Sequence, residues 1–315
     1  MTGKSKVYIT GRMNLDISMF NARNGIDIVS DKNDADIIIS QSSIKYPELL
    51  HKTIYIAYEP PISNHRQWCY NNFDKMLLVV AYDPDISKEN QISFCTDDAF
   101  QWYPTYADPY EYITREITTI NKRGVFFAGN ILRPENSFSE SLPSGYKNIC
   151  HLRKIMGTYF LQHHEGSQII GLGWNNQQSK SDYWRKEKTE LLKNPNIDFI
   201  LALENTIQPN YITEKIWDGI ASDKVTLYLG DPRIENHIPT NCFVDLRPYY
   251  DNSTGNINMD ALSNRLKTMT QDEYDSILIN ARQFRKLAHG NYRKYCKDLT
   301  SRLIKFIKFY KSNKA

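Results

Sequence analysis

Residues 198–230 read DFILALENTIQPNYITEKIWDGIASDKVTLYLG, and this stretch predicts the fold of the second half of the chain. Apart from its first residue, the run 198–203 is continuously apolar, which is typical of a strand buried on both faces. Pro209 breaks regular structure, residues 213–221 follow a helical pattern, and residues 225–229 form a second apolar run. A strand, a crossover helix and a second strand in this order indicate a parallel α/β sheet.

Comparable apolar runs occur on both sides of this stretch, and each is short enough for a single strand. Strands are predicted at residues 6–10, 36–40, 53–57, 76–80, 124–128, 167–171 and 242–245, and helices at 108–120, 147–160, 213–221 and from 260 onward. Strands separated by so many residues favour crossovers over hairpins. The sequence therefore predicts an α/β protein with two doubly wound, Rossmann-type domains that face each other across a cleft.

The domain boundary is expected where the composition changes. A segment rich in Tyr, Pro and charge, residues 97–122, separates the two groups of predicted strands. We assign residues 1–121 to an N-terminal domain, 122–290 to a C-terminal domain and 291–315 to a C-terminal basic amphipathic helix. Ligands of doubly wound sheets bind at the carboxyl ends of the strands, so candidate site residues are sought there.

Composition excludes several functional classes. The 315 residues are 41% hydrophobic and 24% charged, as in ordinary globular proteins, and the net charge of +3 is too small for a general nucleic-acid binder. No run approaches the roughly 18 apolar residues of a membrane-spanning helix, and the first residues lack the apolar core of a signal peptide. Five scattered cysteines without a CxxC pair favour a reduced protein, so we expect a cytoplasmic location.

The segment 299–311 combines apolar and basic residues. Leu299, Leu303, Phe306 and Tyr310 fall on one helical face, with lysines interleaved. Such a helix suits the surface of an anionic membrane, which makes peripheral membrane contact one interpretation. We favour the commoner arrangement, in which the helix packs across the other domain.

Polar residues cluster in the segment 204–217, between the apolar strand and the following helix. Thr213 can cap that helix, and the free N–H groups and positive dipole end of a helix start suit a phosphate. Lys215 adds a cation there, and Glu214 can accept hydrogen bonds from sugar hydroxyls. The alternative is an ordinary strand–helix loop with a surface Glu-Lys pair.

The same residues match a family pattern close to F-x-L-x-x-E-N-[ST]-x-x-x-x-Y-[IV]-T-E-K-[LI], which runs here from Phe199 to Ile216. The downstream patterns V-P-[IV]-Y-x-G and P-x-x-[SA]-F-[IV] are similar to residues 225–230 and 239–244. With these motifs, the chain resembles the α1,3/4-fucosyltransferases, glycosyltransferase family 10. The resemblance covers most of residues 53–250 and is tight from 199 to 245.

The resemblance implies a GT-B-like fold and an inverting transfer of L-fucose from GDP-β-L-fucose to a hydroxyl of an N-acetylglucosamine-type glycan acceptor. It implies no cofactor and no essential metal, because this fold neutralises the leaving diphosphate with Lys, Arg and helix dipoles. The donor-binding residues that it implies are Arg153, Glu204, Asn205, Tyr211, Thr213, Glu214 and Lys215. Lys147 and Arg133 are rivals of Arg153 for the phosphate-binding cation on the neighbouring helix.

The catalytic base implied by the resemblance is Glu59. The segment 58–61 reads Tyr-Glu-Pro-Pro and resembles the family's F-E-S-P element, whose Glu is taken as the base. Inversion by a single displacement needs one carboxylate to accept the acceptor proton, and Glu59 follows a predicted strand at its carboxyl end. The alternative is a solvated Glu before a Pro-Pro turn. The arginine of a further family element, Y-R-x-D-S-D, is missing at residues 82–85.

Other signals indicate weaker alternatives. Asp83-Pro84-Asp85 is a literal DxD, a metal-binding element of another glycosyltransferase fold, but such a tripeptide more often marks a turn. Gly171-Leu172-Gly173 lacks the third glycine of a dinucleotide-binding loop. Two alternative functions stay open: a transferase of the same fold that uses another GDP-sugar, and a non-catalytic protein that binds a nucleotide or sugar.

Overall fold

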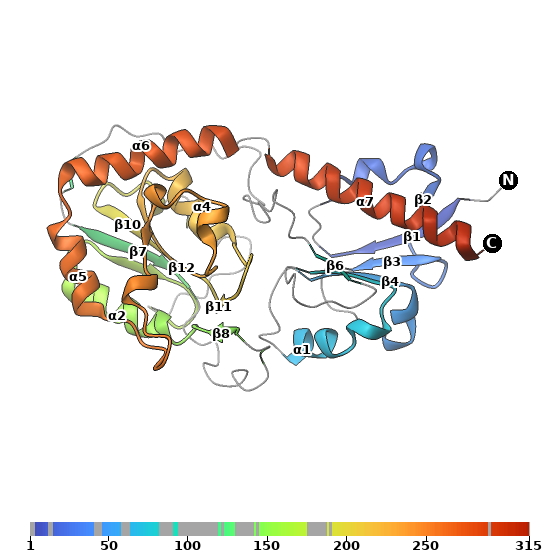
Figure 1. Ribbon diagram of the computed structural model, residues 1–315, viewed down its shortest axis with the longest axis horizontal. Helices are drawn as coiled ribbons and strands as arrows, with labels where there is room; N and C mark the ends of the chain where they lie inside the picture. Colours follow the sequence, from blue (N-terminus) through green and yellow to red (C-terminus); the bar gives the residue numbers. More distant parts are fainter. Residues whose placement is uncertain are drawn as a thin grey trace. The chain divides into compact units, whose positions relative to one another are not determined.

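The computed structural model in Figure 1 describes most of the chain, in two compact units. The described residues are 4–11, 15–40, 46–57, 64–81, 91–93, 119–120, 123–129, 142, 145–174, 188, 191–288 and 291–314. Unit 1 consists of Met1–Gln101 together with Gly290–Ala315, and unit 2 of Trp102–His289. The segment expected to be a separate C-terminal helix, 291–315, thus groups with the N-terminal residues in unit 1.

Unit 1 contains a six-stranded sheet with the strand order β2-β1-β3-β4-β5-β6, in which all neighbours are parallel. The strands are β1 Ser5–Thr10, β2 Ile26–Ile28, β3 Ile37–Ser40, β4 Thr53–Ala57, β5 Leu78–Ala81 and β6 Gln91–Ser93. All five residues of β4 are buried, as expected for a strand covered on both faces. Figure 1 shows α7, Asn291–Lys314, on one face of this sheet and α1, Asn64–Asn71, on the other.

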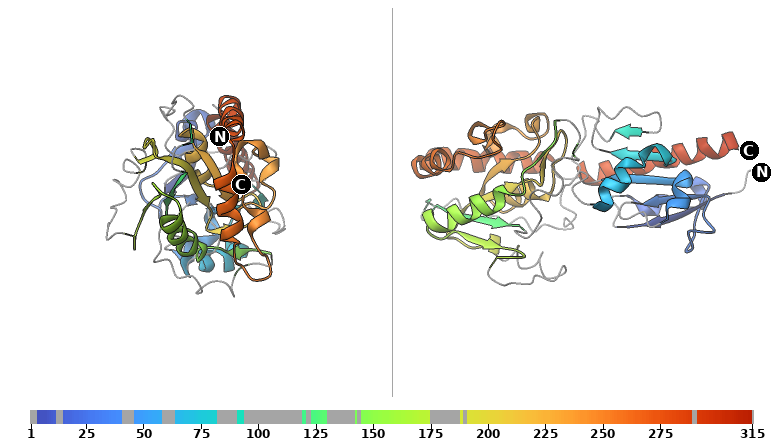
Figure 2. Two further views of the ribbon diagram at one scale, coloured as in Figure 1. Left: turned by 90° about the vertical axis from the view of Figure 1, so that its left-hand side faces the viewer. Right: turned by 90° about the horizontal axis from the view of Figure 1, so that it is seen from below.

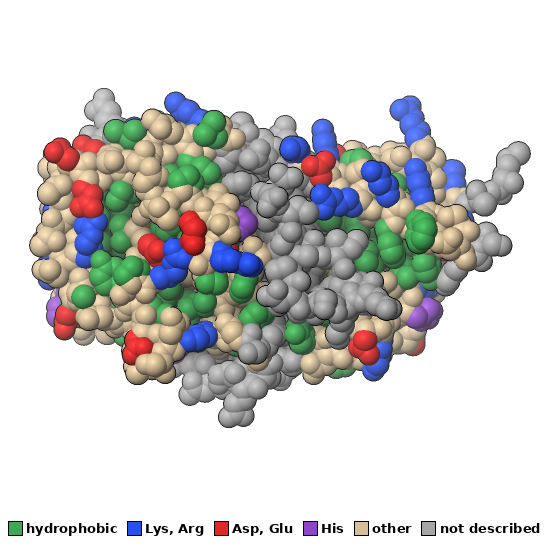
Figure 3. Space-filling model, viewed as in Figure 1, with side chains coloured by type: hydrophobic (Ala, Val, Ile, Leu, Met, Phe, Trp, Pro, Cys, Tyr) green, Lys and Arg blue, Asp and Glu red, His purple; other side chains and the backbone are tan. Residues whose placement is uncertain are grey.

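Helix α7 packs on unit 1 through an apolar face that differs from the predicted one. Leu299 and Leu303 are buried as expected, but Ile304 and Ile307 complete the buried face, while Phe306 is only partly covered. The hydroxyl of Thr300 accepts a 2.9 Å hydrogen bond from the backbone N–H of Asp16. Five basic side chains along α7 are exposed: Lys294, Lys297, Arg302, Lys305 and Lys308. Figure 3 shows Lys and Arg side chains gathered over this part of the surface. None of the helices in the described ranges is long and apolar enough to cross a membrane.

Unit 2 contains a five-stranded parallel sheet with the order β13-β12-β10-β7-β9. Its strands are β7 Gly124–Ala128, β9 Gln168–Ile170, β10 Ile197–Leu203, β12 Val225–Leu229 and β13 Val244–Asp245. The central strand β10 is buried along its whole length. A short antiparallel pair lies apart from this sheet and joins β8, Lys147–Asn148, to β11, Thr206–Ile207.

Helices lie around the sheet of unit 2, as the two views of Figure 2 show. They are α2 Leu152–His163, α4 Glu214–Ala221, α5 Met259–Thr268 and α6 Gln271–Ala288. Short 3₁₀ turns occur in both units: η1 Ile17–Met19, η2 Ala22–Asn24, η3 Pro47–Lys52, η4 Phe73–Lys75, η5 Ile234–Asn236, η6 Thr240–Cys242 and η7 Arg247–Tyr249. The main core joins β10 and β12 to α2, α5 and α6 through Phe199, Leu227, Met156, Leu266 and Leu278.

The two parallel sheets confirm the predicted Rossmann-type α/β class for both units. The helix predicted at 147–160 is wrong at its start, since residues 147–148 pair with β11 and α2 begins at Leu152. The strand predicted at 242–245 begins only at Val244, since η6 extends to Cys242. Of the helix predicted at 108–120, only Thr119 and Ile120 lie within the described residues, and neither is helical.

Candidate functional site

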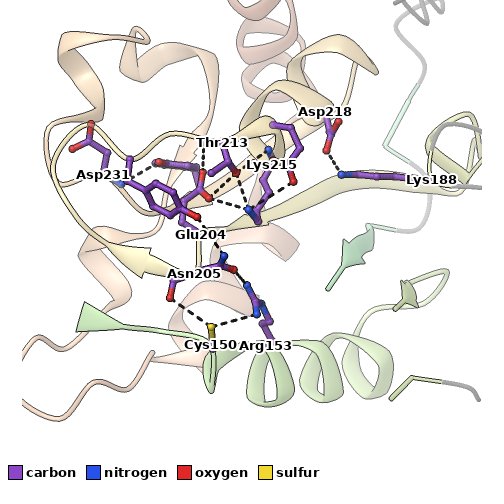
Figure 4. A network of polar contacts seen from close by, with 12 residues as sticks. Cys150, Arg153, Lys188, Glu204, Asn205, Thr213, Lys215, Asp218 and Asp231 are labelled. Carbon is purple, nitrogen blue, oxygen red and sulfur yellow. Dashed lines mark hydrogen bonds and ion pairs between the residues drawn. The ribbon is translucent and has the colours of Figure 1, made fainter. Parts of the chain in front are cut away.

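Polar side chains gather where the central strands of unit 2 end. Glu204 and Asn205 directly follow β10, and the backbone N–H of Glu204 donates a 2.9 Å hydrogen bond to Leu229 at the end of β12. Thr213 caps α4, and its hydroxyl accepts from the backbone N–H of Lys215 at 3.5 Å. The carboxyl edge of the sheet and the start of a helix therefore meet at one place, shown in Figure 4.

Glu204 ties this helix start to the sheet. Its Oε1 accepts a 2.8 Å hydrogen bond from the backbone N–H of Thr213, and its Oε2 accepts a 2.7 Å bond from the Thr213 hydroxyl. The Nζ of Lys215 lies 3.1 Å from Oε2 of Glu204 and 2.7 Å from the hydroxyl of Thr213. Because Glu204 is fully buried, these bonds hold the first turn of α4 in one position.

Burial and neighbouring charges oppose each other at this ion pair. Burial is the largest influence on Glu204 and raises the pKa of its carboxyl, against the lowering effect of the Lys215 ammonium. Burial alone would lower the pKa of Lys215, but the carboxylates of Glu204 and Glu214 outweigh it and raise that pKa. Lys215 therefore keeps its positive charge at neutral pH.

Gly230 makes the close approach of Glu204 to β12 sterically feasible. A Cβ atom at position 230 would lie 2.4 Å from Cγ of Glu204 and 2.5 Å from the hydroxyl oxygen of Tyr228. Both distances are shorter than carbon contacts in folded proteins allow, and both partners are buried. A side chain at this position would displace Glu204.

Arg153, on the first turn of α2, joins the same assembly from the other side. Its guanidinium donates to Oδ1 of Asn205 and to Sγ of Cys150, the latter at 3.3 Å. The amide nitrogen of Asn205 donates in turn to the hydroxyl of Tyr211 at 3.3 Å. The positive charge of Arg153 also lowers the pKa of Lys215, which places the two cations within electrostatic reach of each other.

Lys147, the alternative to Arg153 as the phosphate-binding cation, bonds to Asn252 instead of to the candidate site. Its Nζ donates to the backbone oxygen of Asn252 at 2.6 Å and to the side-chain oxygen of the same residue at 3.1 Å. The structure therefore favours Arg153 over Lys147 as the basic residue beside Asn205. The other rival, Arg133, lies outside the described residues.

Lys188 is a further cation at the site and was not predicted from the sequence. It forms a buried ion pair with Asp218 on α4, one turn after Glu214. Burial tends to raise the pKa of Glu214, but the charges of Lys215 and Lys188 outweigh it and lower that pKa to about 2. No sequence pattern around Lys188 indicates this role, because its ion pair with Asp218 on α4 forms only when the chain is folded.

The predicted donor-binding residues divide into a buried and an accessible group. The structure brings all seven together at this edge of the sheet. Five of them are at most 5% exposed: Arg153, Glu204, Asn205, Tyr211 and Thr213. The side chains of Lys215 and Glu214 are 17% and 27% exposed, so these two present the charges that a ligand can reach. The buried members fix the position of the accessible pair.

Two sets of predicted residues lie outside the described residues: the proposed base Glu59, and Asp83 with Asp85. Within the ranges that are described, no three His, Cys, Asp or Glu side chains come together in a geometry that could hold a metal ion. The role of Glu59 and the independence from metal therefore stay predictions.

Comparison with known proteins supports the resemblance seen in the motifs. Residues 159–277 match the family model described as glycosyltransferase family 10 (fucosyltransferase) C-term. Two curated relatives are both named GDP-fucose protein O-fucosyltransferase 3: one from Xenopus tropicalis, 46% identical over 43 residues, and one from Xenopus laevis, 44% identical over 43 residues. Each alignment covers 14% of this chain and only 9% of the relative.

Solved structures share the fold at low sequence identity. An α1,3-fucosyltransferase crystallised with GDP-fucose is 14% identical, with a TM-score of 0.51, over 88% of this chain and 82% of that chain. Anabaena HepE in complex with UDP and glucose is 9% identical, with a TM-score of 0.50, over 95% of this chain and 99% of that chain. These likenesses confirm the GT-B-like fold, and residues 159–277 are similar to the C-terminal part of the family 10 fucosyltransferases.

Proposed function

We propose that this chain is a fucosyltransferase that uses GDP-β-L-fucose as donor and a hydroxyl of an N-acetylglucosamine-type glycan as acceptor, with inversion at the anomeric carbon. The observation that carries the proposal is the accessible Lys215–Glu214 pair at the start of α4, held by buried Glu204 and Thr213 within a family 10 domain. The donors named for the similar proteins support the choice of a GDP-sugar.

Lys215 and the first turn of α4 suit the diphosphate of the donor. An ammonium group and the free N–H groups of a helix start both favour phosphate, and here they lie at one place. Arg153 supplies a second positive charge close to Lys215. Glu214, ionised because of the nearby lysines, can accept hydrogen bonds from ribose or sugar hydroxyls.

The reaction is then a single displacement. The acceptor oxygen forms a bond to the anomeric carbon of fucose while the bond from that carbon to the GDP oxygen breaks, and GDP leaves with the electron pair. Lys215, Arg153 and the start of α4 stabilise the negative charge that grows on the leaving diphosphate. We assign the acceptor proton to Glu59, an assignment that rests on its motif.

A donor screen with the full chain tests this proposal. We expect GDP-fucose to raise the melting temperature and to be hydrolysed or transferred, whereas GDP-mannose and UDP-glucose have weaker effects or none. Lys215→Ala should weaken GDP-fucose binding by roughly 10- to 150-fold, the range for loss of a charge-assisted hydrogen bond. Lys267→Ala, which removes an exposed lysine from α5, is the matched control and should bind like the wild type.

Three results would contradict the proposal in different ways. A response to another GDP-sugar alone would keep the site but change the donor. Binding of GDP-fucose without turnover on any acceptor would favour a non-catalytic binding protein. Normal GDP-fucose affinity in folded Lys215→Ala would remove Lys215 from the diphosphate site.

A further inference from the structure

A second buried polar cluster lies beside the candidate site, just beyond the end of β12. Asp231 follows Gly230, and its carboxyl is completely buried. Oδ1 accepts a 2.9 Å hydrogen bond from the backbone N–H of Arg233, and the backbone N–H of Asn210 also bonds to this carboxyl. Oδ2 accepts no regular hydrogen bond from the described residues and lies 3.7 Å from Nε2 of His237. The carboxyl is thus buried with few partners.

His237 contacts the side chain of Asn210, the residue whose backbone N–H bonds to Asp231. Its Nε2 lies 3.2 Å from Oδ1 of Asn210. Asn210 has φ of 61°, in the left-handed region that non-glycine residues seldom adopt. Asp231 binds the backbone of this residue and His237 binds its side chain, so together they stabilise a backbone conformation that is otherwise unfavourable.

The clamped residue is directly connected to the candidate donor site. Asn210 precedes Tyr211, whose hydroxyl accepts from Asn205, and Asn205 in turn accepts from Arg153. Three residues after Asn210, Thr213 is held by Glu204. The segment 208–213 is therefore fixed by Glu204 at its end and by Asp231 and His237 near its start.

We propose that Asp231 and His237 are positioning residues that hold the segment 208–213 in its donor-binding conformation, and that protonation of Asp231 weakens this hold. The inference rests on the proposed function, because the segment's ligand is taken to be the GDP-sugar. Neither residue needs to touch the donor. Both act through Asn210 on Tyr211, Asn205 and the start of α4.

Burial sets the pH range of this effect. It raises the pKa of Asp231 to about 6, against the lowering influence of the N–H groups of Arg233 and Asn210. Other titratable and charged groups lie around this carboxyl and around the neighbouring phenol of Tyr228. They are Arg233, Glu235 and His237 after β12, Glu204 after β10, and Tyr211. The ionised carboxylate predominates above about pH 6, and the clamp weakens as the pH falls through that value.

The test is the affinity for GDP-fucose measured between pH 7.5 and pH 5 without acceptor. GDP-fucose is the better probe than GDP, because its diphosphate has no terminal phosphate that titrates near pH 6. For the wild type we expect about fivefold weaker binding at pH 5, from replacing charge-assisted by neutral hydrogen bonds at Asn210. Asp231→Asn, which cannot ionise, should bind at all pH values about as weakly as the wild type does at pH 5.

The controls separate positioning from general structural damage. Asp198→Asn removes another buried carboxylate, one that accepts from the backbone N–H of Arg123 at the opposite end of β10, and should keep the wild-type pH profile. His237→Ala should weaken binding at pH 7.5, and His237→Gln should restore it, because the Gln amide can reach Asn210 as Nε2 does. Circular dichroism and melting curves confirm that each variant is folded.

The outcomes distinguish this inference from the proposed function. If the wild type binds GDP-fucose and Asp231→Asn shows the same pH dependence of affinity, the role of Asp231 is overturned. If Asp231→Asn does not fold, then a flat profile in the wild type, or equal affinities of His237→Ala and His237→Gln, would overturn the inference. A wild type that binds no GDP-fucose at any pH would overturn the proposed function itself.

Discussion

Replacing Asp231 by asparagine should stabilise the protein at neutral pH while it weakens donor binding. Burial raises the pKa of this carboxyl from 3.8 to about 6, so the folded state disfavours the ionised form. The contribution of Asp231 to stability is then fully present below about pH 4 and is lost as the pH rises through about 6. A shift of about two units corresponds to about 3 kcal/mol above pH 7, a penalty that the neutral Asn side chain avoids.

The assay is urea or thermal unfolding of the wild type and Asp231→Asn at two pH values. At pH 7.5, we expect the variant to melt roughly 6–12 °C higher, from the usual 2–4 °C per kcal/mol for a unit of this size. At pH 5, the advantage should shrink to about half, because the wild-type carboxyl is then largely protonated in the folded state. Asp198→Asn should lower stability similarly at both pH values, because it weakens the hydrogen bond to Arg123.

A variant that is equally destabilised at both pH values would refute this reasoning. Asp231 would then be an ordinary ionised hydrogen-bond acceptor whose loss costs contacts at any pH. If Asp231→Asn is more stable but binds the donor with unchanged affinity, the cost of burying the ionised carboxylate is confirmed. Asp231 would then have no role in donor binding. The combination that we expect, more stable and weaker in binding, is characteristic of a residue kept for function.

Three further predictions concern the proposed reaction and its site. Glu59→Gln should lower turnover by roughly 10²- to 10⁴-fold with an almost unchanged dissociation constant for GDP-fucose, and turnover close to that of the wild type would exclude Glu59 as the base. Gly230→Ala should destabilise unit 2 by roughly 1–3 kcal/mol and weaken GDP-fucose binding, because its methyl group displaces Glu204; normal melting and binding would show that Glu204 can shift without consequence. Activity should survive EDTA, measured as fucose transfer before and after chelation, and loss restored by manganese would instead support Asp83 and Asp85 as ligands.

Much of the fold was predictable because strand signals are local. The runs at 53–57, 124–128 and 225–229 coincide with β4, β7 and β12, since continuous apolar runs need burial on both faces wherever they occur. Pairing between distant segments was not predictable in this way. Residues 147–148 form β8 because β11, almost 60 residues later in the sequence, offers them a partner. For residues 147–148, this tertiary pairing outweighs the local preference for a helix.

The buried face of α7 shows a similar limit to prediction from sequence. Helical periodicity correctly identifies an amphipathic segment, but it assigned the buried face to Leu299, Leu303, Phe306 and Tyr310. The structure buries Ile304 and Ile307 in addition, and leaves Phe306 only partly covered. Periodicity locates an apolar stripe to within about one residue on the helix, whereas the surface that it meets decides which side chains are enclosed.

The sequence by itself determined the strand–loop–helix unit around residues 198–221, its capping Thr213 and the charged pair Glu214–Lys215, because these features depend on neighbours in the chain. Only the tertiary structure decided which charges are buried and which are paired. No sequence pattern marks Asp231, which stands before Pro232, as a buried carboxylate, and Lys188 lies far from Asp218 along the chain. The physical reason is that desolvation and ion pairing depend on what surrounds a group in space, so they become defined only when β12, α4 and the loop at Asn210 have packed together.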